Sequence, residues 1–461
     1  MRNINCYAMC VLRCAQNANR KSHHVMLKKI NQILWAIFLF TFPFSIRFIV
    51  YEEASYRFGN FNPWVTGFVY GPEILLGAIF ILWLLDKYLR HRARTGHLAG
   101  QNPIPTEIPP INTPEKPEPI NHKYKVILGI LLLLFVINAG VMTFLKGDPI
   151  LFAFFTLRIM EAAAIYLLLT KRLLQDGAVI QILLAGALFQ FAWGWLQWKL
   201  NHSLSLSLLG ESVIGPDILG VAKTNLAEGA KHIRPYGSFL HPNILAAYLM
   251  AIMLISIPYL KKYRLVFWLV ILTGAVYFTQ SSAASLVTLA CFALIVLFSF
   301  ARSHHIQKYI AFFLLLLFFL VNAWVFVNSS SLSFSSTSLQ ERLDQNIVSH
   351  EMFLDNPFGV GVSNYTLEME KYGTEKLQPW EFQPVHNTYF LILNETGPQG
   401  LALILAFVIL AIAIYWKGVY TIPALSLLLL APFDHFLWDS FAGLVLIALV
   451  AGFFRLANIK E

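Results

Sequence analysis

The stretch HNTYFLILNETGPQG, residues 386–400, stands where a long polar segment runs directly into an apolar one. Its His-Asn pair follows the mostly polar residues 328–385, and Gly397 and Gly400 lie about one helical turn apart farther along. A histidine at the point where an extramembrane loop enters a membrane helix can meet a water-borne acceptor and a lipid-borne donor together. The stretch therefore predicts a transmembrane helix with a functional site at its start.

The composition of the whole chain supports a membrane protein. Hydrophobic residues make up 57% of the sequence and the mean hydropathy is +0.61. Charged residues make up 13%, which is about half of the ~25% that is usual in soluble domains. Many apolar runs are long enough, at roughly 17–25 residues, to cross a ~30 Å hydrocarbon core. We therefore predict an all-α polytopic membrane protein, and we interpret the net charge of +9 through its distribution between loops, with no nucleic-acid partner.

Hydropathy predicts about twelve transmembrane helices. We place them near residues 31–50, 64–85, 126–145, 150–169, 178–198, 242–260, 265–280, 285–301, 309–327, 388–416, 419–433 and 439–454. An even number of spans puts both termini on the same side of the membrane.

The distribution of basic residues predicts which side that is. The segments on the side of the termini carry 23 Lys and Arg residues, and the segments on the opposite side carry 9. Cytoplasmic loops carry the excess of Lys and Arg in membrane proteins, so both termini are expected in the cytoplasm. The expected segments are a cytoplasmic tail 1–30, helices 1–5 over 31–198 with a Pro-rich cytoplasmic linker 86–123, a periplasmic loop 199–241, helices 6–9 over 242–327, a large periplasmic loop 328–387, helices 10–12 over 388–454, and a cytoplasmic tail 455–461.

Three polar residues on the periplasmic side have side chains suited to transfer from a diphosphate. Arg234 and Arg342 stay charged at physiological pH, and a guanidinium can bond two phosphate oxygens at once. His386 has the pKa range of a general base that accepts the proton of a hydroxyl acceptor. We expect Arg234, Arg342 and His386 to lie on the same face of the membrane.

The motifs around these three residues resemble those of the O-antigen ligase family of membrane glycosyltransferases. RPYGSFLHPNILAAYL at 234–249 resembles the family's arginine motif before a span, and QERLDQ followed by NPFGVGVSNY at 340–365 resembles its large-loop motif. His-Asn, nine residues, Gly, two residues, Gly completes the order. The resemblance covers roughly 230–405. One departure is Ser282-Ala283, where many members carry Ser-Arg. Either that arginine is dispensable in this chain or the substrate contact differs here.

The resemblance implies a GT-C-like fold and a metal-independent, inverting transfer without a cofactor. The donor would be a glycan on undecaprenyl diphosphate, and the acceptor a hydroxyl of a glycan or of lipid A-core at the periplasmic face of the bacterial inner membrane. His386 would be the catalytic base, and Arg234 and Arg342 would bind the diphosphate. Supporting roles would fall to Asn387, Glu395, Gly397, Gly400, Asn243, Gly359 and Gly361.

Several other polar residues have alternative interpretations. We expect an ion pair between Arg158 and Glu161, three residues apart in the fourth span, with lipid-phosphate binding by Arg158 or Arg47 as the alternative. Glu395 would orient donor hydroxyls or join a packing network. Asp434, His435 and Asp439 are expected in a solvated turn.

Three activities of one superfamily are compatible with the motifs: ligation, glycan polymerisation and transfer to protein. A flippase for the same lipid is a more distant alternative. A transporter places its polar residues near the bilayer midplane, whereas those of this chain gather at one face, which favours catalysis there.

Overall fold

The computed structural model describes residues 25–53, 55–57, 60–98, 122–225, 231–301, 303–328, 330, 337–373 and 382–457. Of the expected cytoplasmic segments 1–30, 86–123 and 455–461, residues 1–24, 99–121 and 458–461 lie outside the described residues. The long helices are α2 Gly71–Leu98, α3 His122–Lys146, α4 Pro149–Thr170, α5 Asp176–Leu200, α6 Pro242–Ser256, α7 Tyr263–Phe278, α8 Ser282–Phe300, α9 His304–Val327, α12 Thr388–Ile414 and α15 Phe441–Ala457.

Short elements connect these helices. The further helices are α10 Thr337–Asp355, α11 Tyr365–Gly373, α13 Ile422–Leu430 and α14 Phe436–Asp439, with single turns η1 Pro63–Val65, η2 Ser207–Leu209, η4 Ile257–Tyr259, η7 Gly418–Thr421 and η8 Ala431–Phe433. Three antiparallel strand pairs are β1 Arg47–Tyr51 with β4 Gly67–Tyr70, β2 Tyr56–Arg57 with β3 Asn60–Phe61, and β5 Lys223–Asn225 with β6 Lys231–Ile233.

The fold is a mostly helical membrane protein, as the composition predicted. Among the described residues, seven helices are long and apolar enough to cross a bilayer: α3, α4, α5, α6 with η4, α8, α9 and α12. The apolar helices Tyr263–Phe278, Gly418–Phe433 and Phe441–Ala457 are shorter. The full count of twelve spans stays a prediction.

The first two predicted spans are wrong in their bounds. Residues 25–41 are helical, but Pro43 follows and Arg47–Tyr51 forms β1 instead of continuing the helix. Proline disrupts a helix, and the sequence RFIVY is rich in residues that favour strands. Residues Gly67–Tyr70 likewise form β4, so the second long helix begins at Gly71, with Pro72 in its first turn. The other predicted ranges lie largely on helices, although 419–433 consists of η7, α13 and η8, and 439–454 includes the break at Ser440 between α14 and α15.

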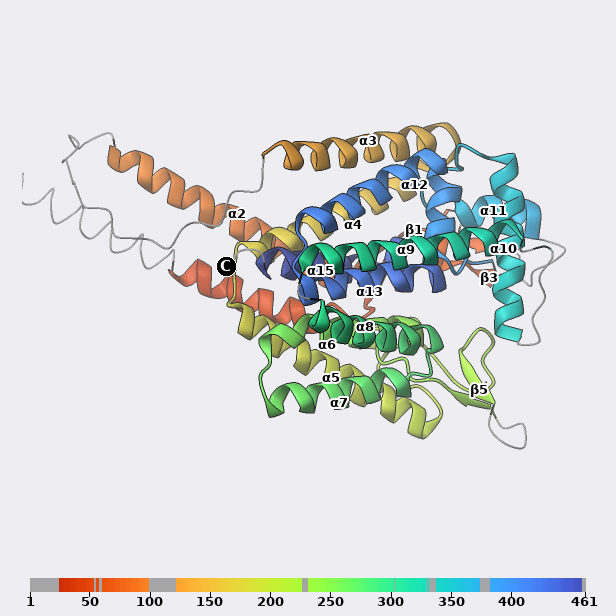
Figure 1. The fold of residues 1–461 in the computed structure, drawn as a ribbon, viewed down its shortest axis with the longest axis horizontal. Coiled ribbons are helices and arrows are strands. Elements are labelled where there is room, and N and C mark those ends of the chain that lie inside the picture. Colours follow the sequence, from red (N-terminus) through yellow and green to blue (C-terminus); the bar gives the residue numbers. More distant parts are fainter. Residues whose placement is uncertain are drawn as a thin grey trace, which may run out of the picture.

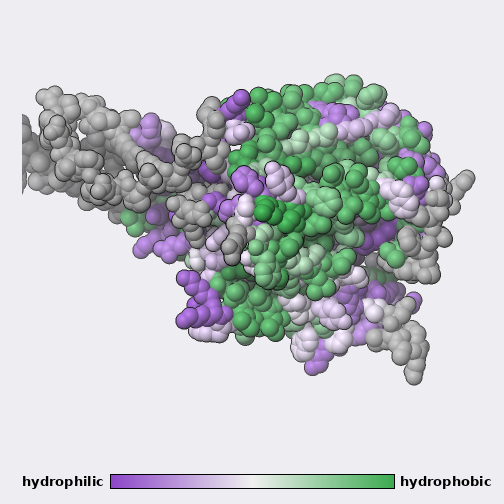
Figure 2. Space-filling model, in the orientation of Figure 1, coloured by the Kyte–Doolittle hydropathy of each residue, from purple (hydrophilic) through white to green (hydrophobic). Residues whose placement is uncertain are grey.

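The helices lie side by side with the extramembrane elements gathered at one end (Figure 1). Helix α15 packs along α4, and α12 packs along α3. Helices α10 and α11, the β5–β6 pair and β1 lie at the opposite end from the C-terminal end of the chain (Figure 1). Apolar residues cover most of the visible face of the helical body (Figure 2). The described parts of segments 199–241 and 328–387 therefore lie at the same end of the bundle.

Helix α10 matches the amphipathic helix that the periodicity from Leu339 to Leu354 predicts. It ends at Asp355, directly before Asn356-Pro357. Gly359 and Gly361 follow with φ of +101° and +94°, values that a glycine adopts without steric cost. The tight turn predicted from these glycines is confirmed.

Helix α12 is broken at the Gly397-Pro398 pair. Gly397 has φ +73° and ψ 174°, outside the helical region, and Pro398 has no N–H to bond the carbonyl of Asn394 four residues earlier. The turn at 359–361 supplies the missing donors: Val360 N–H bonds Asn394 O at 2.9 Å, and Gly361 N–H bonds Glu395 O at 3.0 Å.

The amide of Asn138 on α3 satisfies a third carbonyl at the break. Its Nδ2 donates to Thr396 O over 2.8 Å. The break in α12 therefore holds the large loop and α3 against the helix through backbone hydrogen bonds. The four glycines of the two motifs serve this close approach, since a Cβ on Gly400 would clash with Thr396 and Asn138.

We predict that Gly359→Ala destabilises the protein by about 1–3 kcal/mol, because a side chain would be forced into a left-handed backbone conformation. Its Cβ would also lie 2.6 Å from Glu395 O. Thermal unfolding in detergent should show a lower Tm. Gly129→Ala on α3 is the matched control, since a Cβ there meets no atom within 4 Å. Equal Tm values for the two variants would contradict the packing role of the 359–361 turn.

Candidate active site

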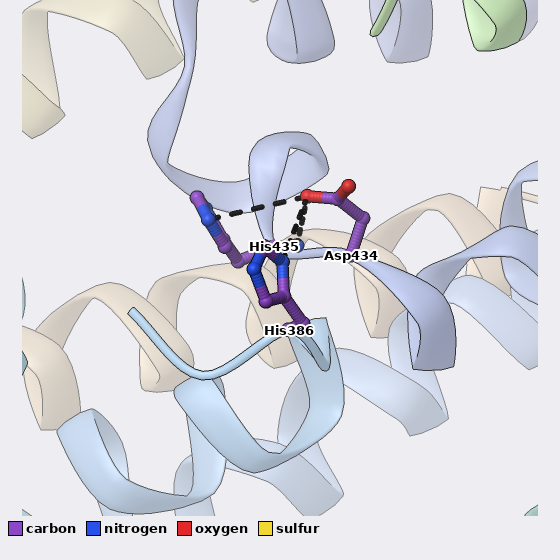
Figure 3. A group of neighbouring side chains, drawn as sticks. All are labelled: His386, Asp434 and His435. Carbon is purple, nitrogen blue, oxygen red and sulfur yellow. Dashed lines mark hydrogen bonds and ion pairs between the residues drawn. The ribbon is translucent and has the colours of Figure 1, made fainter. Parts of the chain in front are cut away.

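His386, Asp434 and His435 form a compact group at the start of α12 (Figure 3). His386 comes from the loop before α12, and Asp434 and His435 come from the turn between η8 and α14. The side chain of His386 is 18% exposed, whereas those of Asp434 and His435 are buried. The group therefore reaches solvent through His386.

Local hydrogen bonds hold His386 in this position. Asn387 caps α12, since its side-chain oxygen accepts from Tyr389 N–H at 3.0 Å and from Phe390 N–H at 3.3 Å. Thr388 donates to the carbonyl of Asp434 from its N–H at 3.1 Å and from Oγ1 at 2.7 Å. These bonds fasten two segments that are distant in the sequence.

The imidazole of His386 lies beside the carboxylate of Asp434. Nδ1 of His386 is 3.8 Å from Oδ1 of Asp434, beyond hydrogen-bond distance, so the interaction is electrostatic. Burial lowers the pKa of His386 below its ordinary value, and the negative charge of Asp434 opposes that shift. Burial disfavours the charge on Asp434, but the neighbouring histidines hold its pKa well below the ordinary range. At neutral pH His386 is uncharged and Asp434 is ionised.

A relay of hydrogen bonds joins Arg234 to Asp434 through Asn243. Nη2 of Arg234 donates to Oδ1 of Asn243 at 3.0 Å, and Nδ2 of Asn243 donates to Oδ2 of Asp434 at 3.0 Å. The other oxygen, Oδ1, accepts from the N–H of His435 at 2.8 Å. The carboxylate of Asp434 is thus fixed on both oxygens.

Arg234 is held on the protein by a second bond. Its Nε donates to Thr279 O at 3.1 Å, at the end of α7. Burial lowers the pKa of Arg234 to about 10, and the nearby charge of Arg342 acts in the same direction. The guanidinium remains charged at neutral pH, with further N–H groups available to a ligand.

Arg342 on α10 adds a second cation to the group. Besides burial, its charge lowers the pKa of Arg234 and of His386, so it lies near both. Its side chain is half-buried, and within the described part of the chain it makes no hydrogen bond or ion pair. Hydrogen bonds and the approach to Asp434 therefore bring Arg234, Asn243 and His386 together, and the charge of Arg342 acts on this group.

The interpretation of Asp434, His435 and Asp439 as a solvated turn is wrong. Asp434 and His435 are buried, and Nδ1 of His435 lies 2.7 Å from Oδ2 of Asp439. Burial opposes the charge on His435, but Asp439 raises its pKa above the ordinary value. The sequence signal was available: an acid-histidine pair within the apolar run APFDHFLWD favours an internal network over a solvated turn.

Sequence reasoning also missed His241 as a structural member of the group. Its Nδ1 accepts from Asn243 N–H at 3.2 Å and caps α6. Burial lowers the pKa of His241 to about 3, so this ring is neutral. It fixes the turn that carries Asn243.

Glu395 joins a packing network beside the break in α12. Its Oε1 accepts from Ser363 N–H at 2.8 Å, and its Oε2 accepts from Nε1 of Trp438 at 2.7 Å. Gly359, Gly361, Gly397 and Gly400 belong to the same region. Glu395 and the glycines thus lie farther along α12 than the histidine group, where they pack and bond with residues 358–363 of the large loop.

Arg158 pairs with a different acid from the one expected. Its Nε lies 3.4 Å from Oε1 of Glu73 on α2, and its Nη2 donates to Phe68 O at 3.1 Å. The expected Arg158–Glu161 pair is therefore wrong, because α2 packs against α4 and supplies a closer carboxylate. The guanidinium of Arg47 lies 4.4 Å from the ring centroid of Phe68.

His386, Asp434 and His435 are close enough to coordinate one cation, since one ligand atom from each lies within 4.8 Å of the others (Figure 3). Two features oppose a cation there. Arg234 and Arg342 add positive charge, and both oxygens of Asp434 already accept hydrogen bonds. The arrangement suits a neutral base backed by a carboxylate, beside two cations that can hold an anionic group.

One comparison with known proteins gives a match. Residues 265–405 match the family described as O-antigen ligase. That range contains Arg342, His386 and the 397–400 break, whereas Arg234 precedes it and Asp434 follows it. No curated protein matches the chain.

We predict that Asp434→Asn lowers the pKa of His386 further, because the carboxylate that raises it is removed. The pH dependence of His386 modification by diethyl pyrocarbonate, followed by peptide mass spectrometry, measures this shift. Asp217→Asn is the control, since Asp217 is exposed on the 199–241 loop. An upward shift for His386 in Asp434→Asn would show that Asp434 is not its charge partner.

Proposed function

We propose that this chain is a membrane glycosyltransferase of the O-antigen ligase type, the family that residues 265–405 match, and that it moves a glycan from undecaprenyl diphosphate to an acceptor hydroxyl. The observation that carries the proposal is the neutral, partly exposed His386 beside an ionised Asp434, with two arginines next to it. This combination provides a base for a hydroxyl and cations for a diphosphate.

In the proposed reaction, His386 takes the proton of the acceptor hydroxyl as that oxygen attacks the anomeric carbon of the donor. The bond from that carbon to the diphosphate oxygen breaks, and the electron pair leaves with the diphosphate. Asp434 stabilises the imidazolium that forms, because its carboxylate is 3.8 Å away and fixed by Asn243. The charges of Arg234 and Arg342 stabilise the leaving diphosphate.

A single displacement inverts the anomeric centre. A double displacement would need a free carboxylate as nucleophile. Asp434, the carboxylate nearest to His386, has both oxygens engaged in hydrogen bonds, which supports inversion. Diphosphate is already a good leaving group, so we propose a metal-independent reaction.

The acceptor is proposed to be a glycan or lipid A-core, presented at the periplasmic face of the bacterial inner membrane. A polymerase would use a second lipid-linked glycan as acceptor, and a protein glycosyltransferase a hydroxyl side chain. Supplying these acceptors in turn to the purified enzyme with the same donor distinguishes the three activities.

We predict that His386→Ala lowers turnover by roughly 10²–10⁴-fold, the usual contribution of a general base. Wild-type activity should rise with pH as His386 loses its proton, with the rise centred below ~6.5, because burial lowers its pKa. The assay is transfer from purified lipid-linked glycan in detergent, with product configuration recorded. His202→Ala is the control, since His202 is exposed on the 199–241 loop.

Retained configuration in the product would overturn the single displacement. Loss of activity with EDTA, restored by a divalent cation, would show instead that the histidine-carboxylate group binds a metal. Binding of the donor should change little in His386→Ala, because both arginines remain.

We predict that Arg234→Ala and Arg342→Ala each lower turnover by about 10²–10³-fold, the usual effect of removing one donor to a developing charge. Arg234→Lys should recover little, because one ammonium cannot bond Thr279 O, Asn243 and a phosphate in the arginine geometry. Arg264→Ala on α7 is the control, because its side chain is exposed. Near-normal activity in both alanine variants at matched expression would remove the arginines from diphosphate binding.

A further inference from the structure

The loop that follows α5 exposes its aliphatic side chains. Between residues 204 and 219, Leu208 is 91% exposed, Val213 74% and Leu219 71%. The loop lies between α5 and β5, at the end of the bundle that holds the extramembrane elements (Figure 1). An extramembrane loop in water normally exposes its polar side chains and buries its apolar ones.

The glutamate of the same loop points inward. Glu211 is 7% exposed, and its carboxylate accepts four hydrogen bonds. The donors are Nε1 of Trp193 at 3.0 Å, Nε2 of Gln197 at 2.8 Å, and the N–H groups of Leu204 at 2.8 Å and Leu206 at 2.7 Å. The loop therefore buries one carboxylate with satisfied oxygens and exposes aliphatic side chains alongside the polar Ser205, Ser207 and Asp217, an arrangement that fits the boundary between water and lipid.

The exposed leucines continue a surface that already faces lipid. Helix α5 has 25 residues, about 37 Å at 1.5 Å per residue, so its end at Leu200 reaches the edge of a ~30 Å core. Trp195 is exposed near that end with Lys199 over its ring, a pairing typical of the membrane interface. The loop begins directly after this point.

A second apolar stretch lies beside the loop. Gly210, with φ +81°, packs against the backbone of Ser45 and Ile46, which allows no side chain there. The strand that follows, β1, exposes three consecutive apolar residues: Phe48, Ile49 and Val50. Gly210 of the loop therefore touches the segment that leads directly into this strand.

We propose that residues 204–219, together with 48–50, form an interfacial lipid-binding surface. Leu208, Val213 and Leu219 insert among the lipid chains of the leaflet on the side of the histidine group. Glu211 holds the loop in this shape from inside. The surface binds bilayer lipid as a class, without a specific headgroup, because among its described outward side chains the aliphatic ones dominate.

This surface is connected to the arginine that the proposed mechanism uses. Oε1 of Gln197 accepts from Tyr236 N–H at 3.1 Å and from Gly237 N–H at 2.8 Å, while its Nε2 donates to Glu211. The N–H of Arg234 bonds Ala222 O at 3.0 Å, directly after the loop. The lipid-inserted loop therefore sets the depth of Arg234 relative to the membrane.

The test uses an environment-sensitive fluorophore on Leu208→Cys in the full chain, reconstituted into phosphatidylcholine vesicles. Cys6, Cys10 and Cys14 are replaced by serine, and Cys291 stays because it is buried. Lys371→Cys is the control, since Lys371 lies on α11 with its side chain 67% exposed. We expect several-fold stronger quenching by doxyl-labelled lipid at 208 than at 371, and the reverse order with aqueous iodide.

Equal quenching by iodide at both positions would show that the loop lies in water and would overturn the proposal. Protection at 208 that depends on the protein-to-lipid ratio, without quenching by doxyl lipid, would identify a second copy of the chain as the occupant and would also overturn it. Both readouts are independent of transfer activity, so they do not depend on the proposed function.

Discussion

The candidate site depends on the pair of hydrogen bonds from Thr388 to the carbonyl of Asp434. They join the first turn of α12 to the turn before α14 in a buried place, where a hydrogen bond meets little competition from water. As a consequence, Nδ1 of His386 lies 3.8 Å from Oδ1 of Asp434. The charge of Asp434 can persist there because Asn243 and the N–H of His435 bond its two oxygens.

The break in α12 also helps to position the candidate site. A helix interrupted by Gly397-Pro398 leaves carbonyl groups without donors, and in an apolar surrounding each unpaired group would cost several kcal/mol. The 359–361 turn and Asn138 bond these carbonyls, so the large loop is tied to the helix that starts at the histidine. The same attachment fixes α10, which carries Arg342, relative to His386. The break in α12 at Gly397-Pro398 thus provides the hydrogen bonds that position the large loop relative to His386.

The sequence allowed much of this to be predicted. The apolar runs predicted a helical membrane protein, and the motifs around Arg234, Arg342 and His386 predicted residues that the structure brings together. The predictions failed where a pairing partner lay far away in the sequence. Arg158 was assigned to the nearest acid along its own helix, whereas Glu73 on α2 is the partner. The strands β1 and β4 were assigned to spans because hydropathy does not distinguish an apolar strand from an apolar helix.

The sequence by itself determined the membrane class, the amphipathic α10, the glycine turns and the resemblance to the O-antigen ligase family over residues 265–405, because hydropathy, periodicity, short motifs and the conformational freedom of glycine are properties of short segments. Only the tertiary structure decided the role of Asp434, His435 and Asp439. The burial of Asp434 and His435 follows from the packing of η8 and α14 against α12, with Asn243 of α6 bonded to Asp434, and a carboxylate changes from a solvated group to a charge partner only when that packing excludes water. The tertiary structure likewise decided that Glu211 is buried while neighbouring leucines are exposed. Trp193 and Gln197, which donate hydrogen bonds to the Glu211 carboxylate, belong to α5, a different element from the loop.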